Sequence, residues 1–167
     1  MIQTARLNIR NLGPSDASFI VSLLNDPSFL RYIGDRGVRT EADALDYIDK
    51  GPAASYARHG FALQAVEPRA GGDPMGICGL LQRDELDAPD LGFAFLPPFR
   101  RRGIAREAAD AVLRDATTRL RLRRVLAITQ ADNDGSIRLL ERLGFGFERL
   151  VPSPRQQAEV RLYSRTW

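Results

Sequence analysis

Residues 96–105 read Leu96-Pro97-Pro98-Phe99-Arg100-Arg101-Arg102-Gly103-Ile104-Ala105 and join a strand-like run to the longest helix-like run of the chain. A helix start offers free backbone N–H groups to an anion, and arginine adds charge-assisted hydrogen bonds. Three cations at a helix N-terminus oppose the helix dipole, which favours a bound anion that offsets them. The stretch therefore predicts a phosphate cradle, with a solvated arginine cluster as the alternative.

On both sides of this junction, the spacing of hydrophobic residues predicts further helices and strands. The helix after it covers residues 102–120, and further helices are expected after Pro14-Ser15-Asp16, from Thr40 to Ile48 and over 133–143. Gly51-Pro52 is expected to end the second of these, and residues 29–37 are typical of a loop. Strands are predicted over 4–12, 61–67, 75–82, 90–96, 124–129, 145–150 and 159–164.

The order of these elements predicts the fold class. A strand, a long helix and a strand in the middle of the chain imply one parallel pair inside a sheet that is otherwise antiparallel. We therefore expect a single α/β domain over residues 1–167, with a mixed, mostly antiparallel seven-stranded sheet and helices on both faces.

Composition excludes several classes of protein. The chain has 167 residues, of which 44% are hydrophobic and 27% charged, as in globular domains and unlike disordered or fibrous ones. Cys78 and His59 are the only residues of their kinds, so neither a disulfide nor a Cys/His metal site is expected. No apolar segment is long enough for a signal or a membrane span, and a cytoplasmic location is expected. The net charge of +3 is too small to indicate nucleic-acid binding.

The cradle differs from two common phosphate-binding loops. The chain has no Gly-x-x-x-x-Gly-Lys segment, which excludes a P-loop, and no Gly-x-Gly-x-x-Gly segment, which excludes the dinucleotide fingerprint. The Arg100-x-x-Gly103-x-Ala105 pattern instead resembles the signature of the GNAT superfamily of acyl-CoA-dependent N-acyltransferases. Residues 133–145, which read Asn-Asp-Gly-Ser-Ile-Arg-Leu-Leu-Glu-Arg-Leu-Gly-Phe, resemble that family's second motif at the usual spacing. The branch with the ribosomal-protein N-terminal acetyltransferases is the most similar.

This resemblance implies a site for acetyl-CoA as cosubstrate. Two splayed parallel strands, around Phe93 to Leu96 and Val125 to Gln130, would hold the pantetheine arm, and backbone amides of the cradle would hold the pyrophosphate. Asn133 would bind the cofactor, or cap a helix, or do both. The predicted cofactor-binding residues are Phe95, Leu96, Arg100, Arg101, Arg102, Gly103, Ile104, Ala105, Asn133 and Ser136.

Three groups are predicted to take part in catalysis. The amide near Leu96 would polarise the thioester carbonyl as an oxyanion-type donor. The tyrosine that protonates the leaving thiolate in many family members is replaced by Leu140, so Ser136 becomes the candidate acid. Asp90 is the candidate general base, with Glu85 as the alternative.

The acceptor is expected to be a primary amine, either a peptide or protein α-amine or a small molecule. Arg31 and Tyr32 lie in a segment predicted as a loop, and we expect them to contact it because loops carry specificity. The predicted function is acetyl transfer from acetyl-CoA by direct attack in a ternary complex, in a monomer or homodimer and without a metal. A non-catalytic acyl-CoA-binding sensor or partner domain is the alternative.

Overall fold

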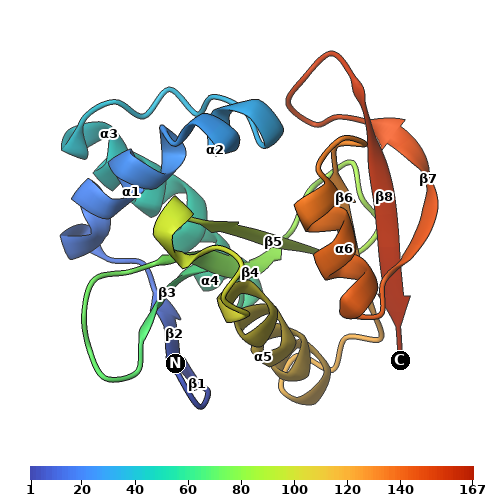
Figure 1. Ribbon diagram of the computed structural model, residues 1–167, viewed down its shortest axis with the longest axis horizontal. Helices are drawn as coiled ribbons and strands as arrows, with labels where there is room; N and C mark the ends of the chain where they lie inside the picture. The colour runs from blue at the N-terminus through green and yellow to red at the C-terminus, as the bar shows by residue number, and fades with distance from the viewer.

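One sheet of eight strands runs through the computed structural model, which describes residues 1–167 (Figure 1). The strands lie in the order β1-β2-β3-β4-β5-β6-β8-β7, and only β5 and β6 pair in parallel. Their bounds are β1 Ile2–Gln3, β2 Leu7–Asn11, β3 Leu63–Pro68, β4 Gly76–Leu81, β5 Asp90–Phe95, β6 Arg124–Thr129, β7 Gly146–Pro152 and β8 Glu159–Thr166.

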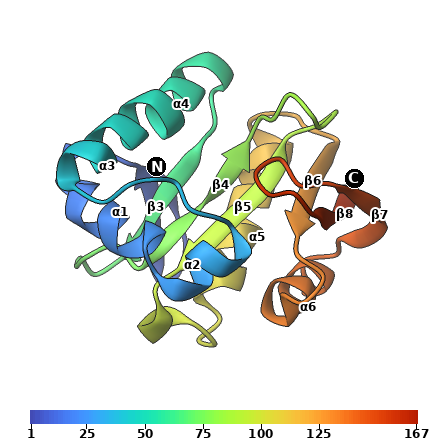
Figure 2. The same ribbon diagram turned by 90° about the horizontal axis from the view of Figure 1, so that it is seen from above.

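Helices cover both faces of this sheet (Figure 2). On one face α1, α2 and α3 pack with Ala65 and Ile77 into a core of 11 buried residues. On the other face α5 and α6 share a core of 21 buried residues with strands β2 to β6 and β8. The helices are α1 Ala17–Leu24, α2 Pro27–Tyr32, α3 Glu41–Ile48, α4 Ala54–His59, α5 Ile104–Thr118 and α6 Asp134–Arg142.

The predicted fold class is confirmed, and three local predictions are corrected. The sheet has eight strands instead of seven, because Ile2–Gln3 forms an additional short strand against β2. Part of the predicted 29–37 loop is helical, because the side chain of Asp26 caps α2 by accepting from the N–H groups of Ser28 and Phe29. Gly51-Pro52 does not end the helical path, because Asp49–Ala53 forms a π-helical turn that leads into α4.

The parallel pair β5–β6 opens almost as soon as it forms. Asp90 and Leu126 are its only register partners, and the Leu126 N–H donates to the carbonyl of Pro89 at 2.9 Å. By contrast, β4 pairs with β5 along its whole length, from Gly76 opposite Phe95 to Leu81 opposite Asp90. The sheet therefore separates between β5 and β6 beyond Asp90.

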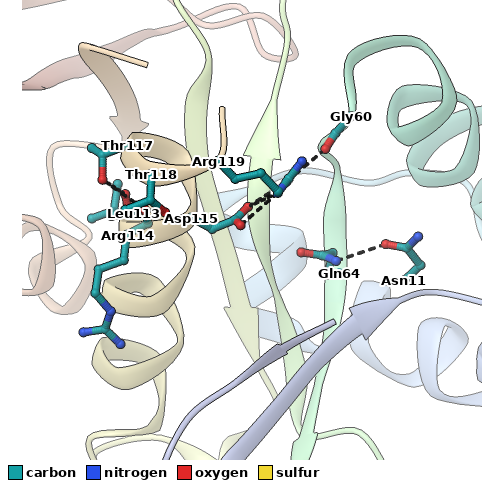
Figure 3. Close-up of polar contacts among 9 residues, drawn as sticks. All are labelled: Asn11, Gly60, Gln64, Leu113, Arg114, Asp115, Thr117, Thr118 and Arg119. Atoms are coloured by element: carbon teal, nitrogen blue, oxygen red, sulfur yellow. Dashed lines mark hydrogen bonds and ion pairs between the residues drawn. The ribbon is translucent and has the colours of Figure 1, made fainter. Parts of the chain in front are cut away.

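The end of α5 is tied to the opposite helical layer by one arginine (Figure 3). Arg119 donates to the Asp115 carboxylate at 2.6 Å and to the carbonyl of Gly60 at 3.1 Å, where α4 ends. Nearby, Gln64 on β3 donates to Asn11 on β2 at 3.0 Å. These contacts fix the end of the sheet that lies away from the 96–105 loop.

The single cysteine lies in the larger core. Cys78 on β4 has no exposed surface, and burial raises the pKa of its thiol to about 12. His59 stacks on Phe61 with ring centroids 5.6 Å apart. None of the helices is both long and apolar enough to cross a membrane.

Candidate active site

A cavity of about 870 Å³ occupies the opening between β5 and β6. Its walls come from α2, β5, the 96–105 loop, the start of α6 and the segment between β7 and β8. Figure 2 shows α2 on one side of this region and β6 with α6 on the other. The cavity therefore lies where the sequence predicts splayed strands.

The 96–105 loop forms one end of the cavity. Gly103 is the residue before α5 and adopts a left-handed conformation with φ +74°, and Arg101 also has a positive φ of 59°. The N–H groups of Arg101, Arg102 and Gly103 donate no hydrogen bond within the chain. Together with the free N–H groups of the first helical turn, they form an anion-binding concavity of the predicted kind.

Two arginines hold this loop in place. Arg6 donates to the carbonyl of Arg102 at 3.2 Å and to the Glu107 carboxylate at 2.6 Å. Arg100 donates to the carbonyl of Phe95 at 2.8 Å and to Asp26 at 2.6 Å. Hydrogen bonds from Ser28 and Arg100 outweigh the effect of burial and lower the pKa of Asp26, which keeps this pair ionised. The side chain of Arg100 therefore connects β5 to the cap of α2.

The amide expected at Leu96 faces the wrong way for an oxyanion donor. The Leu96 N–H donates to the carbonyl of Met75 at 3.0 Å, on the β4 side of the strand. Backbone directions alternate along a strand, so the N–H groups of Phe93 and Phe95 point toward the opening beside β6. The carbonyl of Phe95, which accepts from Arg100, lies on that side as well. The prediction for Leu96 was therefore wrong, because the amide of the neighbouring residue, Phe95, faces the opening instead. Leu96 also does not line the cavity.

The start of α6 forms a second wall near the loop. The side-chain oxygen of Asn133 accepts the N–H of Ser136 at 3.3 Å, so Asn133 is a helix cap. Both residues line the cavity. Leu140 is 1% exposed and belongs to the core. Ser136 is therefore the hydroxyl that the second motif presents to the cavity.

Asp90 begins β5 and lines the cavity, although only 1% of it is exposed. Burial raises the pKa of its carboxyl to about 6, against the opposing charge of Arg83, whose Nε lies 3.0 Å from Oδ1. A carboxylate that titrates near neutrality can accept a proton and release it again. Glu85, the alternative base, is exposed and does not line the cavity.

The two predicted acceptor contacts behave differently. Tyr32 lines the cavity, as expected. Arg31 does not line it, because its guanidinium donates to Asp132 at 3.1 Å and lies over the Tyr32 ring, 4.9 Å from the centroid. Arg31 thus joins α2 to the β6–α6 segment, and its contact with the acceptor stays a prediction.

Among the cavity residues that the sequence interpretation missed, four come from segments far apart in the chain. Arg36 follows α2, Tyr47 lies on α3, Arg83 precedes β5 and Arg155 lies between β7 and β8. The only local signal was at Arg36, which stands between glycines with φ of 114° and 68° at residues 34 and 37. The four come from distant segments, so their proximity follows from the fold.

The cavity combines three chemical elements in one space. One end offers free backbone N–H groups, its middle is flanked by the open edge of β5, and Asp90 lies at the start of that strand. No group of three or more His, Cys, Asp or Glu side chains is arranged to hold a metal ion. The predicted site residues that line the cavity are Tyr32, Asp90, Phe95, Arg100, Arg101, Gly103, Ala105, Asn133 and Ser136.

A family model and a curated relative that match this chain are both described as acetyltransferases. The family model described as "Acetyltransferase (GNAT) domain" matches residues 6–146. The Bacillus subtilis protein "Uncharacterized N-acetyltransferase YnaD" is 25% identical over 155 residues, which cover 90% of this chain and 88% of that protein.

Solved structures share the same fold. MccE, the microcin C7 self-immunity acetyltransferase solved with acetyl-CoA and AMP, superposes with a TM-score of 0.84 at 13% identity, covering 98% of this chain and 94% of that one. RimL, a ribosomal L7/L12 α-N-protein acetyltransferase solved with coenzyme A, gives a TM-score of 0.77 at 15% identity and covers 98% and 95% of the two chains.

Proposed function

The chain belongs to the GNAT acetyltransferase family, and from this we propose that it transfers acetyl from acetyl-CoA to a primary amine by direct attack in a ternary complex. The family expected from the two motifs is thereby confirmed. The observation that carries the proposal is the cavity, which joins the free N–H groups of residues 101–103 to the buried carboxylate of Asp90.

The residues present fit acetyl-CoA. Three unpaired backbone N–H groups at a helix start suit a pyrophosphate, and the left-handed Gly103 lets it approach the backbone. The open edge of β5 would accept the pantetheine arm. MccE and RimL, which share the fold, were solved with acetyl-CoA and coenzyme A respectively. Further cations that line the cavity are Arg101, Arg106, Arg138 and Arg142.

The reaction would begin with a proton transfer and end with the release of a thiol. The Asp90 carboxylate would accept a proton from the docked ammonium, and the neutral amine would attack the thioester carbon. The N–H groups of Phe93 or Phe95 would stabilise the oxyanion that forms. As the carbon–sulfur bond breaks, the attacking nitrogen loses its second proton to water. The thiolate is protonated by water or by Ser136, which then recovers a proton from water. The product amide and coenzyme A leave the cavity.

Thiol release with a panel of amines tests this function. We expect acetyl-CoA to bind with a dissociation constant in the micromolar range, about −8 kcal/mol, and a primary amine to release coenzyme A faster than buffer alone. The amide product is then identified by mass spectrometry. Calorimetric binding of acetyl-CoA without acetylation of any amine would favour a sensor, and absence of binding would contradict the proposal altogether.

A further inference from the structure

Three guanidinium groups gather at the Asp90 end of the cavity. Arg36, Arg83 and Arg155 line it, and Asp90 is the acidic side chain that one of them contacts directly. Arg83 uses its Nε for Asp90 at 3.0 Å, whereas Arg36 and Arg155 form no ion pair. This end of the cavity therefore holds more positive than negative charge.

Arg36 carries the strongest sign of a missing partner. Its Nε is fully buried and has no hydrogen-bond acceptor, and no other atom of its side chain forms a hydrogen bond within the chain. Burial and the neighbouring Arg155 lower the pKa of Arg36 to about 10, so the group is still charged at neutral pH. Burial and Arg83 likewise lower the pKa of Arg155. Buried charges are normally paired, and an oxyanion would supply the acceptor that the chain lacks.

These guanidinium groups lie away from the end of the cavity that would take the pyrophosphate. Asp90 and Arg83 are at the beginning of β5, and the free N–H groups of residues 101–103 follow its other end. The strand from Asp90 to Phe95 spans about 17 Å at the usual rise per residue. One phosphate group cannot occupy both places, so the arginines face the acceptor and not the pyrophosphate.

The walls beside the arginines favour a small acceptor. Gln130 at the end of β6 donates to Gln156 at 2.8 Å and to the carbonyl of Arg31 at 3.2 Å. Gln156 also lies beside Gly34, so the β7–β8 segment touches both sides of the cleft. Figure 1 shows this segment, in red, extending toward the end of α2. A folded protein would have to displace this bridge, whereas a small molecule would not.

We propose that the acceptor is a small amine that also carries an oxyanion, a carboxylate or a phosphate, held by Arg36 and Arg155 while its amino group faces Asp90. The proposal rests on the proposed function for the acetyl-transfer step, but the anion site itself does not. Arg83 would keep Asp90 in position and share the bound anion. The forked guanidinium suits the planar carboxylate and the phosphate equally.

Binding of inorganic phosphate to the full chain saturated with coenzyme A tests the anion site, because coenzyme A occupies the other anion-binding end. We expect saturable binding by calorimetry, weakened at least tenfold in Arg36→Met and retained in Arg36→Lys. Arg58→Met removes the same charge from an exposed helical position outside the cavity and should leave phosphate binding unchanged. Equal binding by wild type and Arg36→Met, or no binding by wild type, would overturn the proposal.

Acetylation of matched amines tests the acceptor class. ω-Amino carboxylates, ω-aminoalkyl phosphonates and neutral amino alcohols of the same spacer length are compared, and the first two distinguish a carboxylate from a phosphate. We expect at least tenfold higher kcat/KM for one anionic series, and a raised KM with little change in kcat in Arg36→Met. Equal rates with the neutral alcohols, or acetylation of peptides alone, would overturn it. Phosphate binding that depends on Arg36 without any acetylation would uphold the anion site and contradict only the proposed function.

Discussion

Gly103 is the residue on which the cradle depends most directly. Its φ of +74° lies in the left-handed region, and a Cβ there would stand 3.4 Å from the Arg6 guanidinium that holds the loop. A β-branched side chain is strained in that conformation by about 1–2 kcal/mol. Substitution would therefore move the N–H groups of residues 101–103 out of register with a pyrophosphate.

We expect Gly103→Val to abolish acetyl-CoA binding measured by calorimetry. Gly60→Val is the matched control, because Gly60 has the same φ of +74° at the end of α4 and does not line the cavity. The control should suffer similar backbone strain and bind acetyl-CoA like wild type. Tight binding by Gly103→Val would show that the cradle has been placed wrongly.

Asp90 gives the reaction its expected pH dependence. Burial raises the pKa of its carboxyl to about 6, so the group is protonated below that pH and able to accept a proton above it. Activity should therefore rise as pH increases through about 6. We expect Asp90→Asn to lower kcat/KM about a hundredfold at pH 6.5 and much less at pH 9, where the amine is already neutral.

Steady-state rates at both pH values check this expectation. Glu85→Gln serves as control, because Glu85 is exposed outside the cavity and its loss should change the rate less than twofold. An equal loss at both pH values would give Asp90 a positioning role, and full activity would remove it from the site.

At the level of elements, α6 places Ser136 at the cavity, whereas Leu140 is buried in the core. If Ser136 protonates the thiolate, Ser136→Ala should lower kcat ten- to a thousandfold with little change in acetyl-CoA affinity. Weaker affinity with an unchanged kcat would instead mean a binding role. Stopped-flow thiol release and calorimetry on the same preparation separate the two.

The contact between α2 and β5 should stabilise the fold. Asp26 is 9% exposed, and removing Arg100 would leave its carboxylate with one partner fewer. Because the Arg100 side chain is 39% exposed, water screens part of the pair, and we expect Arg100→Met to lower the free energy of unfolding by about 1–2 kcal/mol at pH 7.

The pH dependence of that loss has a definite sign. The pKa of Asp26 is lowered in the folded chain, so its stabilising contribution is present above the unfolded value of about 4 and is lost as pH falls through the folded value. The difference between Arg100→Met and wild type in urea denaturation should narrow from pH 5 toward pH 3. Arg106→Met removes an exposed pair with a 3.8 Å separation and should cost less than about 0.5 kcal/mol at any pH.

Elements with strong periodicity were predictable from the sequence. The spans of α5, α6 and β6 agree with their patterns, and the Thr40–Asp43 capping box forms with hydrogen bonds of 3.1 and 3.0 Å. The continuation of the helix through Pro52 was not predictable, because the proline fits only where the helix widens into a π turn. The oxyanion donor on β5 was not predictable either, because the hydrogen bond from Leu96 to Met75 decides which amides of the strand face the opening. The motifs thus identified the 96–105 loop and the start of α6, whereas only the tertiary structure brings Arg36 and Arg155 to the cavity.

For the whole molecule, the important feature is that β5 and β6 share one register pair beside the cavity. Side-chain contacts such as Arg31 with Asp132 supplement it across the cleft. A cofactor inserted between the strands would contact both halves and stabilise the folded state by about 2.7 kcal/mol at a hundred times its dissociation constant. For a chain of this size we expect acetyl-CoA to raise Tm by about 5–10 °C. Thermal scans of Gly103→Val should show no such increase.

Because Cys78 is completely buried, its thiol does not react with reagents in solution while the chain is folded. A disulfide reagent added to the native enzyme would meet only the sulfur of released coenzyme A, so turnover can be recorded continuously without correction for protein labelling. The same reagent also measures the rate of unfolding, because Cys78 can react only after the sheet around β4 has separated. One sulfur atom per chain thus reports on unfolding without interfering with the measurement of catalysis.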